Sequence, residues 1–251
     1  MLPSSPLFLG KQISRYEKFD DPWRSLTNSV RTGKPVHQVN TEEEAQQFFP
    51  ELAEAIMPMN FGYAQHLAQH LNVNKLPESA RILDVAAGTG VWSIPLVLAN
   101  HQLKVDALDF PSILAVTKKT VTKFGVADRY QYLSGDWRDV SWSHKVYDLV
   151  ILGHILHSEG VAQSKALLKR CFDAMKPGGI VVVAEFIAND ERNAPPVALL
   201  FAINMYVYTT EGCVFSESEL EQLLTECGFE GCYRMPIEGE DSPIVIAKKP
   251  L

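Results

Sequence analysis

The 251-residue sequence has few cysteines, no dense run of positive charge and no apolar stretch long enough to cross a bilayer. Its four cysteines include one C-x4-C pair, Cys227 and Cys232, without a matching pair or histidine cluster nearby. We therefore expect reduced, partly buried thiols and no cysteine zinc site. Acidic residues outnumber basic ones, 30 to 23, for a net charge of −7. Because such a surface repels phosphate backbones, nucleic acid is a poor candidate partner.

The N-terminal segment also lacks a basic residue before its short apolar patch, Leu7-Phe8-Leu9, which argues against a signal peptide. We therefore expect a cytoplasmic protein that does not associate with membranes. Hydrophobic residues make up 46% of the chain, an ordinary share for a globular protein. The length allows one α/β domain with a large core and a modest extension.

Apolar strands alternate with amphipathic helices from about residue 80 onward. This alternation predicts a doubly wound, Rossmann-like α/β sheet of seven strands, mostly parallel, with helices on both faces. The last two strands are close in sequence and predict an antiparallel C-terminal hairpin. We expect strands at 81–86, 103–109, 129–133, 147–153, 179–186, 230–236 and 243–248, and helices at 91–100, 111–123, 160–175, 196–208 and 217–228.

Residues 1–75 are predicted to form a helical N-terminal extension, and residues 76–251 the sheet domain. Within the extension, Thr41 and Glu44 have the spacing of a helix start, and apolar residues follow at helical spacing. A second helix is expected from Tyr63 to Leu71. Trp23 and Leu26 are expected to anchor the irregular first part of the extension.

A glycine-containing loop, Asp84-Val85-Ala86-Ala87-Gly88-Thr89-Gly90, follows the first predicted strand. Glycine lets the backbone turn tightly and approach a ligand. Ser93 stands where the dinucleotide pattern G-x-G-x-x-G has its third glycine, which argues against an NAD-dependent oxidoreductase. Asp109 ends the second strand 19 residues after Gly90, where a carboxylate can accept hydrogen bonds from both ribose hydroxyls. These features predict a nucleoside site; the alternative is a plain strand–turn–helix with an incidental Asp109.

Gly135-Asp136-Trp137 follows the third predicted strand. A carboxylate at this strand end can accept a hydrogen bond from an adenine amino group, and Trp137 offers a flat apolar face for the ring. The alternative is a surface Asp136 beside a core Trp137.

Five strings together resemble the class I S-adenosylmethionine (SAM)-dependent methyltransferases: DVAAGTG, ALDF, GDW, YDLVILGHILH and KPGG-IVVVAEF. Within that class, about residues 15–250 resemble the O-methyltransferase family of plant caffeate and flavonoid enzymes and bacterial natural-product enzymes. The resemblance implies SAM as cofactor, no metal, and a small hydroxylated aromatic or polyketide-like acceptor. The cofactor contacts that it implies are Asp84, Ala86, Gly88, Thr89, Gly90, Asp109, Phe110, Asp136, Trp137, Gly153 and His154.

Two of these positions depart from the family pattern. Ala86 stands where many relatives have glycine, and we expect binding to survive because alanine is small. Gly153 stands where plant relatives carry a lysine near the cofactor, so recognition of the cofactor carboxylate is expected to differ.

His154 and His157 follow the fourth predicted strand, at the ligand end of the sheet. Methyl transfer to a hydroxyl needs a base, and a histidine placed against the hydroxyl can take its proton. The resemblance implies that His157 is this base and that Glu185 orients it. The second glutamate of plant relatives aligns with Val214, which leaves the histidine less tightly held. The alternative is that His157 caps the next helix and Glu185 is a buried structural acid. The H-x-x-H spacing of His154 and His157 could also suggest a metal site, but no third ligand is apparent in the sequence.

Residues 199–208 are apolar on nearly every side, which predicts either a buried core helix or a lid over an apolar acceptor. The resemblance implies substrate-lining positions at Ile56, Met59, Met205 and Thr209, with residues 1–75 covering the acceptor side.

The resembled family normally begins with a helical dimerisation domain, and this sequence begins about where that domain ends. A homodimer and a hetero-partner therefore both stay open. Two other functions also stay open: a SAM-dependent C- or N-methyltransferase or non-methylating enzyme of the same fold, and a non-catalytic SAM-binding partner subunit.

Overall fold

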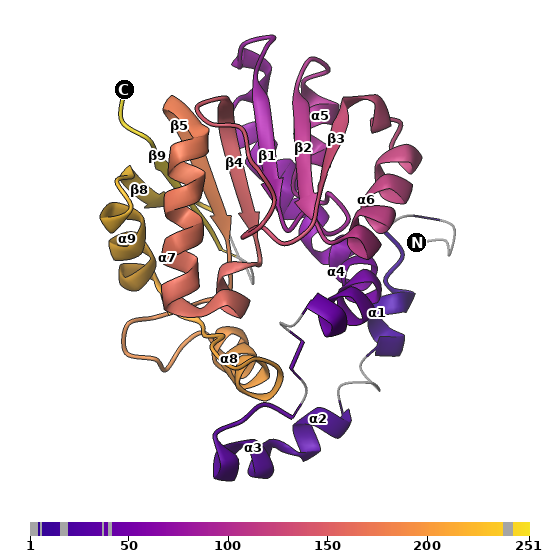
Figure 1. Cartoon of the computed structure of the whole chain (residues 1–251), viewed down its shortest axis with the longest axis vertical. Helices are drawn as coiled ribbons and strands as arrows, with labels where there is room; N and C mark the ends of the chain where they lie inside the picture. Colours follow the sequence, from indigo (N-terminus) through magenta and orange to yellow (C-terminus); the bar gives the residue numbers. More distant parts are fainter. Residues whose placement is uncertain (1–4, 6, 16–19, 37, 40–41, 238–242) are drawn as a thin grey trace.

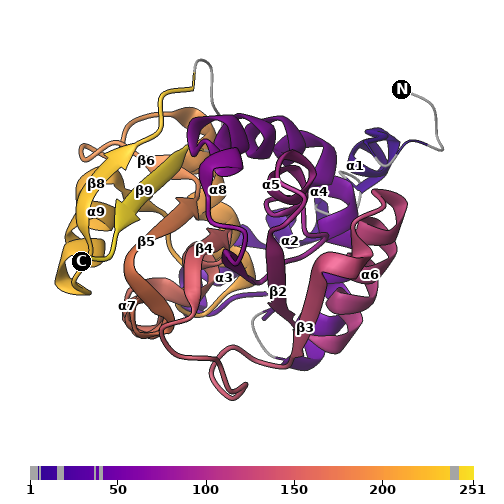
Figure 2. The ribbon, with the colours of Figure 1, turned by 90° about the horizontal axis from the view of Figure 1, so that it is seen from above.

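The computed structural model describes residues 5, 7–15, 20–36, 38–39, 42–237 and 243–251. Its centre is a seven-stranded sheet with the order β3-β2-β1-β4-β5-β9-β8, covered by helices on both faces (Figures 1 and 2). Strands β1 to β5 pair in parallel, and β9 runs antiparallel to both of its neighbours. The predicted mostly parallel sheet with an antiparallel C-terminal hairpin is therefore confirmed. Its strands are β1 Arg81–Val85, β2 Lys104–Asp109, β3 Tyr130–Ser134, β4 Tyr147–Gly153, β5 Met175–Ala184, β8 Glu230–Arg234 and β9 Ile244–Lys248.

Successive residues of the central strands point to opposite faces and build two cores. In β1, Ile82 packs into the cluster that includes α4, α5 and α6, whereas Leu83 packs into the cluster that includes α7 and α9. Both faces of the sheet are therefore buried, which explains why the strands read as nearly continuous apolar runs.

The five helices expected after residue 80 are present with adjusted ends. They are α5 Ile94–Ala99, α6 Pro111–Lys123, α7 Leu156–Ala174, α8 Pro196–Tyr208 and α9 Glu217–Glu226. α5 begins late because residues 91–93 still belong to the turn after the glycine loop. α7 begins four residues earlier than predicted and bends at Gly160, where φ is 72° and ψ 176°. A short parallel pair, β6 Ile187–Ala188 and β7 Phe215–Ser216, was not predicted.

The prediction of two separate helices in the N-terminal extension was wrong. A single helix, α4 Glu42–His70, continues through Pro50 and Pro58. Proline normally disfavours a helix interior, but α4 packs apolar residues into two core clusters, one before Pro50 and one on both sides of Pro58, and this packing outweighs the local cost. The buried residues of α4 in the second of these clusters are Met57, Phe61, Ala64, Leu67 and Ala68. The expected cap residue Thr41 lies outside the described residues.

Three shorter helices precede α4 in the described part of the chain: α1 Gly10–Arg15, α2 Asp20–Arg24 and α3 Leu26–Thr32. α2 and α3 lie against α8, far from them in sequence (Figure 1). The indole of Trp23 donates to Asn204 Oδ1 at 2.5 Å, and Leu26 packs beside Val207 and Tyr208. The two predicted anchors therefore fasten the extension to α8.

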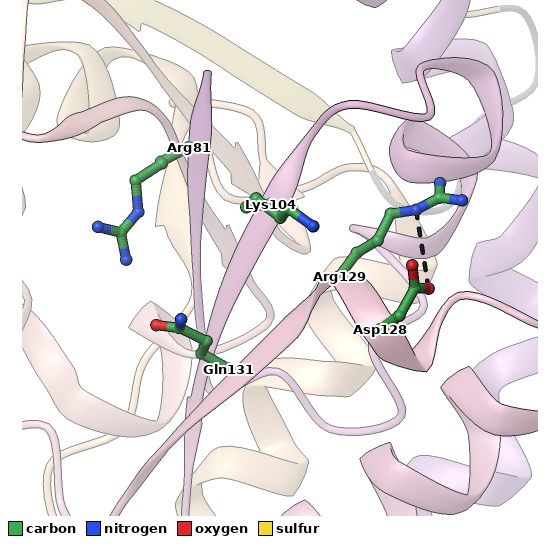
Figure 3. Close-up of a pocket in the computed structure, with 5 residues that line it drawn as sticks. All are labelled: Arg81, Lys104, Asp128, Arg129 and Gln131. Carbon is green, nitrogen blue, oxygen red and sulfur yellow. Dashed lines mark ion pairs between the residues drawn. The ribbon is translucent and has the colours of Figure 1, made fainter. Parts of the chain in front are cut away.

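The amino ends of β1, β2 and β3 frame an open depression of about 320 Å³, lined by Arg81, Lys104, Asp128, Arg129 and Gln131 (Figure 3). Two of its cations have internal partners, since Arg81 bonds to Asp106 at 2.6 Å and Arg129 donates to Val97 O. None of the predicted site residues lies there. All four cysteines are free, and no helix in the described part of the chain is long and apolar enough to cross a membrane.

Candidate active site

The loop after β1 turns through three residues with left-handed backbone conformations. The φ angles are 54° at Ala86, 57° at Gly88 and 78° at Gly90. Glycine adopts such angles freely, but alanine at Ala86 has a Cβ and costs about 1 kcal/mol there. A Cβ added at Gly88 would lie 3.6 Å from the Ala53 Cβ of α4, so α4 closes one side of the loop.

Hydrogen bonds from β2 and α6 hold this loop in place. Asp109, at the end of β2, accepts from Gly88 N at 2.9 Å and from Phe110 N at 2.8 Å. Thr117 of α6 donates its hydroxyl to Gly88 O at 2.6 Å. Burial raises the pKa of Asp109 to about 6, although the two N–H groups favour the charged form. Thr117 was not singled out in the sequence, because nothing near it marks a partner 29 residues away.

Asp84 lies beneath the loop. The Ser93 hydroxyl donates to Asp84 Oδ2 at 2.5 Å and lies 3.0 Å from the Tyr130 hydroxyl. Burial raises the pKa of Asp84 to about 7, with the Ser93 hydrogen bond opposing the rise. Asp84 thus ties β1 to the start of α5, while a direct contact of Asp84 with SAM stays a prediction. In the same loop, Thr89 is buried and its Oγ1 has no hydrogen-bond partner among the described residues.

Asp136 lies in a network with Arg138 and Glu159, which no motif in the sequence marks. Arg138 Nη1 is 3.0 Å from Asp136 Oδ1 and 2.9 Å from Oδ2, and Arg138 Nη2 pairs with Glu159 of α7. The same guanidinium lies over the Trp137 ring, 4.7 Å from its centroid. Burial raises the pKa of Glu159, which the Arg138 charge opposes. The sequence carried no signal for Arg138 beyond its position two residues after Asp136.

Gly153, the last residue of β4, lies directly against Trp92. A Cβ at Gly153 would come within 2.2 Å of Trp92 Cδ1, so the buried indole fills the space that a side chain would need. A lysine in the position of plant relatives is therefore incompatible with this packing. His154 follows with φ at 62°, and its ring contacts those of Trp92 and Phe186 at centroid distances of 5.9 and 5.1 Å. Burial lowers the pKa of His154 to about 4.

His157 and Glu185 form a buried pair. His157 Nδ1 lies 2.6 Å from Glu185 Oε2, and the His157 backbone N–H donates to Oε1 at 3.2 Å. Burial alone would raise the pKa of Glu185, but the charge and hydrogen bonds of His157 more than offset it, and the pKa is lowered. An ionised Glu185 places the proton on Nδ1 and leaves Nε2 as the basic nitrogen. Glu185 also satisfies an N–H in the first turn of α7, so the structural and the orienting contacts coexist.

Aromatic rings that were not singled out in the sequence surround this pair. Phe201 of α8 meets the His157 ring edge-on at 4.7 Å, and Phe186 stacks on Phe201 at 3.9 Å. Phe186 directly follows Glu185, and Phe201 lies one helical turn before Met205. In the sequence, these positions are the only indication that the two rings lie beside the histidine. In the sequence, no third metal ligand is apparent beside His154 and His157. In the structure, Glu185 at the end of β5 lies close enough to both histidines to be that third ligand.

The loop after α8 links Thr209 to the start of α7, because Gly212 N donates to Thr209 Oγ1 and Cys213 N donates to His157 O. Met205 and Thr209 are both buried, and the Thr209 hydroxyl donates to Met205 O at 2.7 Å and accepts from Gly212 N at 3.0 Å. A Cβ at Gly212 would lie 2.7 Å from His157 O, so this loop packs tightly on the start of α7.

The other predicted positions are less enclosed. Ile56 is half-buried on α4, and Met59 is 47% exposed. Neither has a described contact with the histidine pair. Val214 is buried in a small apolar cluster with Ala188 and Ala198 and supplies no second carboxylate.

Residues 23–230 match the family model of the O-methyltransferase domain. The tetracenomycin polyketide synthesis 8-O-methyltransferase TcmO of Streptomyces glaucescens is 27% identical over 91% of this chain and 67% of its own length. The L-tyrosine C(3)-methyltransferase of Streptomyces lavendulae is 29% identical over 72% of this chain and 50% of its own. The crystal structure of a candidate O-methyltransferase from Nostoc punctiforme matches with a TM-score of 0.86 at 27% identity, over 98% of this chain and 73% of that one.

This chain spans between half and about two thirds of the length of these two curated relatives. The family match covers most of the chain and confirms the resemblance seen in its motifs. The loop after β1, the carboxylates that follow it and the His157–Glu185 pair all lie inside the matched range. The chain therefore belongs to the O-methyltransferase domain family.

Proposed function

We propose that the protein transfers a methyl group from SAM to a hydroxyl of a small aromatic or polyketide-like molecule, with His157 as general base. The observation that carries the proposal is the buried His157–Glu185 contact of 2.6 Å. It lies at the carboxyl ends of β4 and β5, where ligands of open α/β sheets bind.

The loop after β1 fits SAM as cofactor. Its left-handed turns allow close approach of a ligand to the backbone, and the Thr89 hydroxyl, which has no hydrogen-bond partner within the described part of the chain, offers a buried polar contact. Asp109 and Asp136 are suited to ribose hydroxyls and an adenine amino group. We infer that SAM is held by these residues together with Asp84, Ala86, Gly88, Gly90, Phe110, Trp137, Gly153 and His154. When bound, SAM supplies a sulfonium-activated methyl group.

The chain itself has to align the acceptor and remove its proton. His157 Nε2 takes the hydroxyl proton as the acceptor oxygen attacks, and Glu185 holds the tautomer and stabilises the imidazolium. Phe186 and Phe201 pack around the base and give an aromatic acceptor an apolar surface.

The acceptor class follows from this apolar surface and from the relatives. Two of them are named for O-methylation in polyketide synthesis and of a naphthoate. We infer that Met205, Thr209, Ile56 and Met59 line the acceptor site, with residues 1–75 as its cover and residues 76–251 as the SAM-binding domain. Packing of α2 and α3 on α8 supports this arrangement. The cytoplasmic location and a homodimer or hetero-partner remain predictions from the sequence.

Mass spectrometry of a panel of phenols and polyketides incubated with the full chain and methyl-deuterated SAM tests the reaction. We expect a gain of one labelled methyl group, located on oxygen by NMR. Calorimetry with SAM, S-adenosylhomocysteine and NAD tests the cofactor separately. Binding of NAD alone, or of none of the three, overturns the proposal. The name of the L-tyrosine relative describes methylation of carbon for that protein. If this chain also methylates carbon, the proposed SAM site stands and the proposed transfer to a hydroxyl is refuted.

A further inference from the structure

Three metal-ligating side chains meet at the carboxyl ends of β4 and β5. The ligand atoms of His154, His157 and Glu185 all lie within 4.8 Å of one another. Glu185 Oε2 is 2.6 Å from His157 Nδ1 and 4.0 Å from His154 Nδ1. One carboxylate oxygen therefore faces two imidazole nitrogens.

The spacing of these atoms is close to that around a bound divalent ion. Zinc binds histidine nitrogen at about 2.0–2.1 Å and carboxylate oxygen at about 2.0–2.2 Å, which separates neighbouring tetrahedral ligands by about 3.4 Å. The shorter contact would have to open by about 0.8 Å and the longer one to close by about 0.6 Å to meet that spacing. The two histidine nitrogens, which lie within 4.8 Å of each other, would have to approach by up to about 1.4 Å, and side-chain rotations of the two imidazoles have to supply these shifts.

The backbone and the neighbouring rings keep the three groups together. His154 has φ at 62°, a left-handed conformation that histidine seldom adopts and that usually needs the surroundings to enforce it. The rings of Trp92 and Phe186 pack against His154, and Phe201 packs against His157. Glu185 is fully buried, so water competes weakly for these ligands.

We propose that His154, His157 and Glu185 bind one divalent transition-metal ion, with Zn²⁺ the best fit, and that this ion blocks methyl transfer. Two imidazoles and one carboxylate form a known zinc ligand set, which leaves a fourth position open. The nitrogen ligands disfavour Mg²⁺ and Ca²⁺, which prefer oxygen. Metal binding needs no methyltransferase activity, whereas the block rests on the proposed function, because the ion takes the contact that orients His157.

Equilibrium dialysis of the full chain against Zn²⁺, with elemental analysis, tests the site directly. We expect one tightly bound equivalent, and a Co²⁺-substituted sample with visible absorption bands of a four-coordinate ion. His154→Asn removes the imidazole and keeps a residue type that tolerates the left-handed backbone. It should weaken Zn²⁺ binding at least about tenfold. His66→Ala, at an exposed histidine on α4, should leave binding unchanged.

Stoichiometric Zn²⁺ binding that His154→Asn and Glu185→Gln both weaken supports the site. The absence of such binding, or an affinity that neither variant changes, overturns it. Inhibition of methyl transfer by one equivalent of Zn²⁺, reversed by a chelator, supports the block, and full activity of the loaded protein refutes it. Chelator-treated protein that methylates no acceptor counts against the proposed function alone, because metal binding is measured without turnover.

Discussion

His157 and Glu185 are 28 positions apart in the chain but in contact in the structure. They meet because β4 and β5 are parallel neighbours and end at the same edge of the sheet. The charge of Glu185 keeps the proton on one side of the imidazole and the basic nitrogen on the other. The chemistry proposed for the site therefore depends on two side chains that a single register of two strands brings together.

Replacement of the proposed base His157 should have a defined effect on rate. His157→Ala should lower kcat for a phenolic acceptor by about 10²–10⁴, the usual contribution of a positioned base. Activity of the variant should recover as the pH rises toward about 10, because an ionised phenol needs no base. Rates measured across pH with saturating SAM check this. Undiminished transfer near neutral pH would remove His157 from the mechanism.

The left-handed backbone of Ala86, in the loop after β1, predicts a stabilising substitution. Ala86→Gly relieves the conformational cost of φ at 54° and should raise the free energy of unfolding by up to about 1 kcal/mol. Ala87→Gly is the matched control, because Ala87 is buried and is not among the positive-φ residues. That variant should be destabilised by roughly 0.5–1 kcal/mol. Urea unfolding of both variants gives the comparison, and equal effects would contradict the strain argument.

Among the helices, α7 contains the sharpest local irregularity. It bends at Gly160 immediately after the His157 turn, where the backbone is left-handed and meets the loop after α8. A Cβ at this position would lie 2.3 Å from Glu211 O. The bend therefore orients the first turn of the helix, which carries the proposed base His157, separately from the remainder.

Two helix glycines should respond in opposite ways to alanine. Gly160→Ala forces a side chain into the Glu211 backbone and should destabilise the protein by at least about 2 kcal/mol. Gly62→Ala, within α4, should stabilise it by roughly 0.5–1 kcal/mol, because among the described residues nothing beyond the neighbouring helix backbone lies within 4 Å of the new Cβ. Thermal and urea unfolding distinguish the two, and a neutral Gly160→Ala would show that the bend is adaptable.

The elements that the sequence predicted well are those whose burial pattern is local. Strands of the central sheet and α6, α8 and α9 follow directly from apolar runs and their stop signals. The continuity of α4 through Pro50 and Pro58 was not predictable, because its cause is packing against α5 and α6. Site residues named from motifs, such as Asp109, were found where two strand ends meet. Arg138, Trp92 and Phe201 were missed because their partners come from other elements.

For the molecule as a whole, buried carboxyl groups couple stability to pH. Asp84 has a pKa raised from 3.8 to about 7, and Asp109 to about 6. The native state therefore holds these protons more tightly than the unfolded chain does. Stability from them is fully present below about pH 4 and is lost as the pH rises toward 7. Glu185 acts in the opposite direction. Its pKa is lowered in the native state, so its contribution to the free energy of unfolding is lost as the pH falls.

Asp84→Asn should remove most of this dependence. Relative to the variant, the wild-type protein should lose up to about 1.4 kcal/mol of unfolding free energy per pH unit between about pH 4 and 7. Urea unfolding without cofactor at several pH values measures the difference. Asp139→Asn, at an exposed position, serves as the control with a constant offset. Parallel curves for wild type and Asp84→Asn would contradict the assignment.

The position of β9 has a consequence for the order of events during translation. This strand follows β8 in the chain but lies between β5 and β8 in the sheet. While residues 244–248 are still inside the ribosome, β5 presents an open edge and β8 has no strand to pair with. At a synthesis rate of about 5–20 residues per second, the nascent protein carries that exposed edge from the emergence of β5 until residues 244–248 emerge and pair with it. During that interval the growing chain is most exposed to chaperones and to aggregation.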